Sequence, residues 1–424
     1  MADAAAMTDA ARRSAFDERV RFLTELGRRL HTAGVSASRL EGAVKSVAGS
    51  IGVTCEIWSS PTGLLLSLGD ADAMSTTQQT RVLRLDPGEI HLGNLAALDR
   101  IAEDVVRGAM TAEEAWTAMR ALDRPVTARQ QLATVAAFGL AAAAVAGLLR
   151  TGWIDIAVAG TLGLVIGWIA LLSATRPHLA AASEAVAALV ATTLATAFAH
   201  FVAPLTLQTV IVAALIVLMP GLTLTTAIAE LASQQLVTGT TRFAGALMVL
   251  LKLTFGSVAA SQVMLAIGWI PQQAEAQVLP QWVEVVAAIA ASFSFAVLFR
   301  AARRDILLVM ASAALGYVLT RLGGVWLGPM ATGAFAGAVF VSSLVVAALA
   351  NLYGRRRGRP GALIRVPGIM LLVPGSVGFR AVSFVMERDY AIGLDTLVAV
   401  LSALIALVAG LLFGSLLVPP RRHL

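Results

Sequence analysis

The chain has 424 residues, of which 58% are hydrophobic and 14% charged, against about 45–50% and about 25% in an ordinary soluble protein. This composition excludes a soluble enzyme, a disordered chain and a disulfide-rich secreted module, the last because Cys55 is the single cysteine. The net charge of +6 comes from arginine clusters between apolar segments, so it indicates membrane topology rather than a nucleic-acid surface.

Most ordinary polar residues lie in the first 130 positions, and from Leu132 onward the chain consists of long apolar segments. This division predicts a small α+β cytosolic domain over residues 1–125, followed by a mostly α polytopic membrane region. The first residues do not form the apolar stretch of a secretory signal, so the N-terminal domain is expected to stay in the cytosol.

The N-terminal domain is predicted to contain two helices, three strands and two further helices. Hydrophobic residues at three- and four-residue steps predict a helix over 15–35, and Ser38-Arg39-Leu40-Glu41 fits a capping box that would start the second. Thr111-Ala112-Glu113-Glu114 fits another capping box. The remaining elements are strands over 53–58, 64–68 and 81–85 and helices over 92–108 and 112–121. The domain has no phosphate loop and no zinc spacing, so we expect no enzyme, no catalytic residue, no cofactor and no metal.

Ten apolar segments follow, most of them close to the roughly 20 residues that a helix needs to cross the hydrocarbon core. They cover residues 131–149, 156–174, 181–201, 205–220, 244–270, 283–299, 305–322, 329–352, 363–385 and 394–418. Ten transmembrane helices divide into five and five, which predicts one membrane repeat over 126–270 and a second over 271–424. An odd number of crossings gives the two repeats opposite orientations, the 5+5 inverted repeat of secondary transporters.

The arginines between these segments indicate the topology, because basic residues collect on the cytosolic side of a membrane. With the N-terminal domain in the cytosol, fourteen of them lie on the cytosolic side: Arg124, Arg129, Arg176, Arg242, Arg300, Arg303, Arg304, Arg355, Arg356, Arg357, Arg359, Arg365, Arg421 and Arg422. Three lie on the outer side, namely Arg150, Arg321 and Arg388. This bias predicts a multi-pass plasma (inner) membrane protein with both termini in the cytosol.

Two Pro-Gly pairs support the repeat. Pro220-Gly221 closes the fourth segment, and Pro374-Gly375 lies within the ninth, 154 residues later. Proline removes a backbone donor and glycine permits a sharp turn, so each pair is expected to break a helix. The helix that follows a break begins with free N–H groups and a partial positive charge, which suits a carboxylate. A plain proline kink is the alternative for either pair alone.

The side chains next to the breaks are the candidate ligands for a small zwitterionic or anionic substrate. Besides Pro220, Gly221, Pro374 and Gly375, the candidates are Thr223, Thr225, Thr226, Ser376, Arg380 and Lys252. Arg380 is the strongest basic candidate for a carboxylate. Glu230 could take up a proton and couple transport to a proton gradient. Two alternatives stay open: Glu230 as an interfacial residue on a re-entrant helix, and Lys252 reaching to the cytosolic interface.

In these features the sequence resembles the threonine/serine exporter family of bacteria and fungi. Four stretches carry the resemblance in chain order, Leu26–Leu68, Leu218–Leu231, Thr238–Phe243 and Arg359–Gly375. Glu230 stands where this family usually has Asp, so the acid is kept with a side chain one methylene longer. The resemblance implies a cytosolic N-terminal domain, ten crossings and proton-driven antiport that exports L-threonine and L-serine.

Two other functions stay open. A related two-chain architecture resembles proteins linked to dicarboxylate (succinate-type) export, and Arg380 with Lys252 would suit two carboxylates. A membrane-anchored sensor or scaffold is the second alternative; it should tolerate Pro220→Ala with Pro374→Ala, whereas a transporter should lose flux. The expected partners are the amino acid, protons and the lipid bilayer, with no nucleic acid, and the glycine-rich segments would allow a homodimer.

Overall fold

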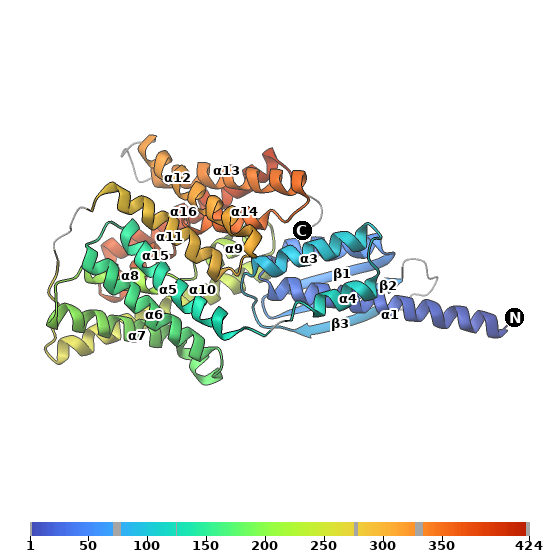
Figure 1. The fold of residues 1–424 in the computed structure, drawn as a ribbon, viewed down its shortest axis with the longest axis horizontal. Helices are drawn as coiled ribbons and strands as arrows, with labels where there is room; N and C mark the ends of the chain where they lie inside the picture. The colour runs from blue at the N-terminus through green and yellow to red at the C-terminus, as the bar shows by residue number, and fades with distance from the viewer. Residues whose placement is uncertain (1, 71–77, 124, 275–278, 327–333, 421–424) are drawn as a thin grey trace.

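The computed structural model describes residues 2–70, 78–123, 125–274, 279–326 and 334–420. An N-terminal α+β region lies at one end of the molecule, and a larger bundle of apolar helices lies at the other (Figure 1). The N-terminal region consists of α1 (Ala2–Thr32), α2 (Ala37–Ser50), β1 (Val53–Ser60), β2 (Gly63–Asp70), β3 (Gln78–Arg84), α3 (Leu92–Val106) and α4 (Ala112–Arg120). The predicted order of helices and strands is therefore confirmed for this region.

The three strands form one antiparallel sheet in the order β1-β2-β3. Leu64, Leu66 and Leu68 alternate along β2 and are buried, because side chains on one face of a strand point the same way. They share a core with helix residues such as Leu26 and Leu40. This core is separate from the cores of the helical region, apart from Ala362 and Val366 of the helical region, which pack against it.

The two predicted capping boxes have different outcomes. At α4 the Thr111 hydroxyl accepts from the N–H of Glu114 at 3.2 Å, and the Glu114 carboxylate accepts from the N–H of Thr111 at 2.8 Å. The box at Ser38 is wrong, since α2 begins one residue earlier with Ser36 at its N-cap and no side-chain capping bond. The carboxylate of Glu41 instead accepts from the N–H of Ser59 at 2.8 Å.

The remainder of the described chain is helical. It comprises α5 (Ala128–Leu148), α6 (Trp153–Ser173), α7 (Pro177–Phe201), α8 (Leu207–Leu215), α9 (Gly221–Ala232), α10 (Leu236–Ala266), α11 (Gln281–Leu298), η1 (Arg303–Asp305), α12 (Ile306–Trp326), α13 (Ala334–Arg357), α14 (Ala362–Met370), α15 (Gly375–Met386) and α16 (Tyr390–Leu417). Among the described residues, nine helices are long and apolar enough to cross a membrane, with α14 and α15 counted together. The start of the predicted segment 329–352, together with Arg124, Arg421 and Arg422, lies outside the described residues.

The fourth predicted segment, 205–220, differs from the prediction because it holds no complete crossing. It contains α8, of nine residues, and is followed by α9, of twelve. At about 1.5 Å per residue, neither helix spans a hydrocarbon core of about 30 Å. The same pair of lengths recurs later in α14, of nine residues, and α15, of twelve. The chain thus contains two broken helices of matching dimensions.

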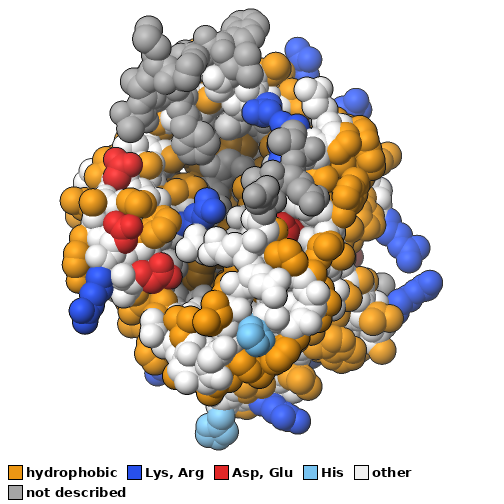
Figure 2. Space-filling view, turned by 90° about the vertical axis from the view of Figure 1, so that its left-hand side faces the viewer, with side chains coloured by type: hydrophobic (Ala, Val, Ile, Leu, Met, Phe, Trp, Pro, Cys, Tyr) orange, Lys and Arg blue, Asp and Glu red, His pale blue; other side chains and the backbone are white. Residues whose placement is uncertain are grey.

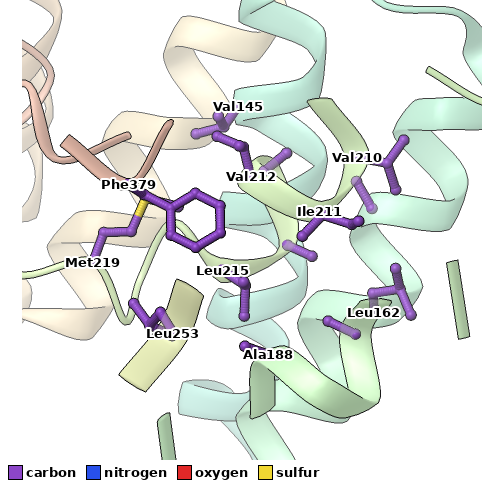
Figure 3. Packing of buried hydrophobic residues seen from close by; sticks show 14 of the residues in the cluster. Val145, Leu162, Ala188, Val210, Ile211, Val212, Leu215, Met219, Leu253 and Phe379 are labelled. Atoms are coloured by element: carbon purple, nitrogen blue, oxygen red, sulfur yellow. The ribbon is translucent and has the colours of Figure 1, made fainter. Parts of the chain in front are cut away.

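Residues from both broken helices share one core. Phe379, four residues after the second break, belongs to the same buried cluster as Met219, which directly precedes the first break. Figure 3 shows the Phe379 ring beside Met219, with Leu215 and Leu253 around them. The end of the bundle remote from the N-terminal region is hollowed near its centre, where a basic side chain lies, with acidic and hydrophobic side chains to the left of the hollow (Figure 2).

Candidate functional site

Both Pro-Gly pairs break a helix, and the backbone geometry at the two breaks is nearly the same. Pro220 precedes α9 at φ −81° and ψ 43°, and Pro374 precedes α15 at φ −81° and ψ 40°. The two breaks also meet. A Cβ added to Gly375 would lie 3.2 Å from the Cα of Gly221, and one added to Gly221 would overlap Cγ1 of Val373. Glycine at both positions therefore lets the backbones of the two broken helices come into direct contact.

The first turns of α9 and α15 start at this contact. The N–H of Gly221 donates to the carbonyl of Met219 at 2.8 Å, and the N–H of Gly375 donates to the carbonyl of Val373 at 2.9 Å. The next amides of each helix have no carbonyl acceptor within their own helix. Such amides, with the helix dipole behind them, are suited to bind an anion.

The predicted hydroxyl ligands have different surroundings. The Thr225 hydroxyl is buried and donates to the carbonyl of Gly221 at 3.2 Å, within its own helix. Thr226 and Ser376 are half-buried, whereas Thr223 is exposed. On α15, Nε of Arg380 is buried and has no hydrogen-bond partner. Of the predicted ligands, Arg380 therefore retains donor capacity next to the breaks.

Glu230 lies near the end of α9 and only 2% of its surface is exposed. Its Oε1 accepts a hydrogen bond from the backbone N–H of Ala37 at 3.1 Å, and Oε2 lies 3.0 Å from Nε of Arg242 on α10. The Arg242 contact is an ion pair whose N–H is not aligned as a hydrogen bond. The carboxylate therefore joins α9, α10 and the start of α2, which belongs to the N-terminal region.

Two further hydrogen bonds join the N-terminal region to α10 beside Glu230. Nε2 of Gln235 donates to Oε2 of Glu41 at 3.2 Å, and the Thr238 hydroxyl donates to the carbonyl of Ser59 at 3.0 Å. Together with the Ala37–Glu230 bond, we refer to these as the docking contacts. They connect residues about 180 to 190 positions apart in sequence and hold β1 and α2 against the helices around the first break.

A second attachment reaches the other half of the helical region. The N–H groups of Leu92 and Gly93, at the start of α3, donate to the carbonyls of Phe299 and Arg300 at 2.9 and 3.2 Å. These carbonyls follow the last residue of α11. The positive end of one helix dipole thus meets the negative end of another, which is a favourable orientation. The N-terminal region therefore contacts α9 and α10 of the first half and the end of α11 in the second half.

A cavity of about 310 Å³ lies between the N-terminal region and the helical bundle, and we call it the interdomain cavity. Its walls come from the α1–α2 junction, α9, α14 and α16. The described charged side chains that line it are Arg39, Glu230 and Arg365, and its hydroxyls include Ser38, Thr225, Thr226 and Ser415. Thr225, Thr226 and Glu230 are thus the predicted site residues that reach this cavity.

Lys252 does not join this cluster. Its Nζ donates to the carbonyl of Ala181 at 2.9 Å and lies 3.4 Å from the Glu184 carboxylate of α7. Lys252 therefore pairs with Glu184, and Glu230 pairs with Arg242. Within the described ranges, no group of three or more His, Cys, Asp or Glu side chains is placed to hold a metal ion.

The sequence missed Ala37, Arg39 and Ser59 as members of the site. A backbone amide and a carbonyl carry no signal in a sequence, and Arg39 looks like any surface arginine of an amphipathic helix. The one available signal was the polar cluster Gln234-Gln235 between two apolar stretches, since such residues next to a membrane helix need polar partners.

Comparison with known proteins identifies two family models that match consecutive parts of the chain. Residues 21–264 match the family described as "Putative threonine/serine exporter", and residues 284–417 match the one described as "Threonine/Serine exporter, ThrE". Together they cover most of the N-terminal region and nearly all of the helical bundle. No solved structure matches the chain.

Three curated proteins are similar over most of the chain. Pheromone-regulated membrane protein 10 of Debaryomyces hansenii is 22% identical over 86% of this chain and 36% of its own length, and that of Eremothecium gossypii is 22% identical over 86% and 49%. "Probable threonine/serine exporter" of Mycobacterium tuberculosis is 27% identical over 78% of this chain and 63% of its own length. The chain thus spans between about a third and two thirds of the curated relatives it matches.

Proposed function

Because the chain belongs to the threonine/serine exporter family, a family of membrane transporters and not of enzymes, we propose that it exports L-threonine, L-serine and similarly small amino acids from the cytosol. The observation that carries this proposal is the direct contact of two matching Pro-Gly breaks within a chain of that family. A pair of broken helices at the middle of a bundle is the arrangement in which many transporters bind their substrates.

The proposed architecture is an inverted repeat of ten crossings, with α8 and α9 together forming the broken fourth crossing. The proposed boundaries are 1–125 for the N-terminal domain and 126–270 and 271–424 for the repeats. Equal helix lengths support it: α6 and α12 each have 21 residues, in addition to the matching broken helices. Two aspartates do so as well, since Asp155 accepts from the N–H of Thr206 before α8, and Asp305 pairs with Arg359 before α14.

The proposed orientation places both termini in the cytosol of a cell whose plasma (inner) membrane holds the protein. The arginine bias of the connecting segments supports this orientation. In this frame the interdomain cavity opens toward the cytosol and the hollow at the opposite end of the bundle faces outward (Figure 2). The two halves would rock about the contact between Gly221 and Gly375, with Arg380 and the first amides of α9 and α15 receiving the substrate carboxylate.

Proton coupling is assigned to Glu230 in this proposal. As a carboxylate, Glu230 holds both the guanidinium of Arg242 and the N–H of Ala37. Protonation would remove the negative charge that strengthens both contacts. A proton bound there would therefore loosen α9 from the N-terminal domain and from α10 in the same step.

The test is counterflow in proteoliposomes under an imposed pH gradient, with labelled L-threonine, L-serine and succinate in parallel. Gradient-driven movement of threonine or serine is expected. Movement of succinate alone would replace the amino-acid assignment by dicarboxylate export. Absence of flux in the wild type, with Pro220→Ala and Pro374→Ala tolerated in folding, would favour a scaffold. For coupling, Glu230→Gln should still exchange labelled threonine but no longer accumulate it against a gradient.

A further inference from the structure

The interdomain cavity has the size and chemistry of a small-ligand site. Its volume of about 310 Å³ is at the lower end of the range of roughly 300–1,000 Å³ that ligand pockets occupy. The lining is mainly apolar, with a few hydroxyls and a few charges that converge from separate elements. The lining includes two cationic side chains, Arg39 and Arg365, and one anionic side chain, Glu230. Charges of both signs suit a zwitterion.

Arg39 is the cationic side chain that the N-terminal region contributes to this lining. It is half-buried, and no hydrogen bond or ion pair joins it to any residue that the structure describes. Burial lowers the pKa of its guanidinium to about 10, so the group is still charged at neutral pH. A half-buried cation without a partner has lost part of its hydration, and no protein group replaces that part. An anion entering the cavity would replace it.

The surroundings of Arg39 favour a carboxylate as that anion. Arg39 lies in the first turn of α2, whose N-cap residue Ser36 makes no side-chain capping bond. The N–H of Ala37 is already used by Glu230, but the hydroxyl of Ser38 lines the cavity on the same turn. A guanidinium binds a carboxylate through two parallel hydrogen bonds, which a single hydroxyl nearby can supplement.

We propose that Arg39 binds the carboxylate of the transported amino acid in the interdomain cavity before the substrate reaches Arg380 at the breaks, so that the N-terminal domain supplies part of the cytosolic substrate site; this inference rests on the proposed export function. The site is then shared by α2, by α9 of the first half and by α14 and α16 of the second. Substrate bound there contacts the same turn that holds Glu230 through Ala37. The N-terminal domain would thus sense substrate and proton on one short segment.

The first experiment measures transport from the cytosolic side in proteoliposomes of the full chain. Arg39→Ala is expected to raise the KM for L-threonine roughly tenfold to a hundredfold, the effect of removing a hydrogen bond to a charged group. Arg39→Lys keeps the charge without the paired geometry and should lose less. The matched control is Arg100→Ala, an exposed arginine on α3, which should leave KM unchanged. Threoninamide, which lacks the carboxylate, should compete with threonine poorly in the wild type and no worse in Arg39→Ala.

The second experiment reads occupancy of the cavity without transport. Cys55 is replaced by serine and Ser38 by cysteine, and labelling by a maleimide is followed with and without L-threonine. The natural Cys55 would contribute little background in any case, because burial raises the pKa of its thiol to about 11. Threonine should slow labelling of the cysteine at position 38, and it should no longer do so when Arg39→Ala is added.

The outcomes separate this inference from the export proposal. If the wild type moves threonine and Arg39→Ala has an unchanged KM and unchanged protection of position 38, the inference is wrong and export stands. If the wild type moves succinate but not threonine, the export proposal fails, and Arg39 is judged by the same KM comparison on succinate. If the wild type moves neither compound and neither protects position 38, both are overturned.

Discussion

The helix after the first break and the helix after the second have the same length and nearly the same starting angles, yet they carry opposite charges. Glu230 is the one charged residue of α9, and Arg380 is the one charged residue of α15. Nine residues after Gly375, where α9 has Glu230, α15 has Phe384. The backbone contact between the two breaks requires glycine on both sides, whereas the side chains further along face different surroundings.

The difference follows from what covers each helix. The Glu230 carboxylate contacts Arg242 and the amide of Ala37, so it serves to attach the N-terminal domain to α9. Arg380 has a buried Nε without a hydrogen-bond partner, so it is available to a ligand. A repeated backbone can therefore serve two tasks, attachment on one side and binding on the other, and four changes to the chain test this division.

The largest expected effect comes from breaking the Glu230–Arg242 pair. Arg242→Met leaves a carboxylate that is 2% exposed without its counter-charge, and the loss should be about 3–5 kcal/mol of stability. Glu230→Met combined with Arg242→Met removes both charges and should be far more stable than Arg242→Met alone. The measurement is thermal unfolding of the purified protein in detergent. A double variant as unstable as the single one would mean that the two residues do not act as a pair.

The next effect tests the contact between the breaks. Gly221→Ala should destabilise the bundle by about 1–3 kcal/mol, because the new Cβ overlaps the side chain of Val373. Adding Val373→Ala should recover much of that loss. Gly375→Ala meets the backbone of Gly221, so the same rescue should fail there. Equal rescue of both glycine variants, in unfolding temperature and in flux, would contradict the described contact.

A smaller effect is expected for Thr238, whose hydrogen bond to Ser59 is one of the docking contacts near the first break. Thr238→Val removes the donor to the Ser59 carbonyl and should cost about 1 kcal/mol. Amide hydrogen exchange should then rise in β1 more than in the transmembrane helices. Thr241→Val is the control, since that hydroxyl is exposed and bonds within its own helix. Exchange that rises equally in both variants would argue against a specific role for Thr238.

The smallest effect is expected at Lys252. Its pair with Glu184 is partly exposed, with 33% and 22% of the two side chains accessible, and such pairs contribute about 0–1 kcal/mol. Lys252→Met should therefore leave both the unfolding temperature and the KM for threonine almost unchanged. A tenfold rise in KM would return Lys252 to the substrate site and revive the dicarboxylate alternative.

Much of the fold was predictable from local patterns. The strand over 64–68 and the capping box at Thr111 depend on neighbouring residues, and both were confirmed. The Pro-Gly breaks were predictable because proline and glycine act on the backbone whatever surrounds them. Hydropathy could not show that 205–220 holds only a short helix and not a crossing of its own, since an apolar half-helix resembles part of a whole one.

The rest depended on contacts between distant parts of the chain. Glu41 fits a local capping pattern, but in the folded chain its carboxylate accepts hydrogen bonds from Ser59 and Gln235 instead. The partner of Glu230 at its first oxygen is an amide 193 residues away, which no local pattern encodes. Arg39 could not be singled out from the sequence either, because its lack of a charged partner is a property of the folded chain.

Left-handed backbone at the ends of corresponding helices has a practical consequence. Gln234, two residues after α9, has φ 63°, and Arg388, two residues after α15, has φ 68°. A left-handed conformation costs a residue with a side chain about 1–2 kcal/mol, and glycine avoids most of it. Arg388 is exposed and is not among the residues that line the interdomain cavity, so Arg388→Gly offers a thermostabilised form for biophysical work at little risk to transport.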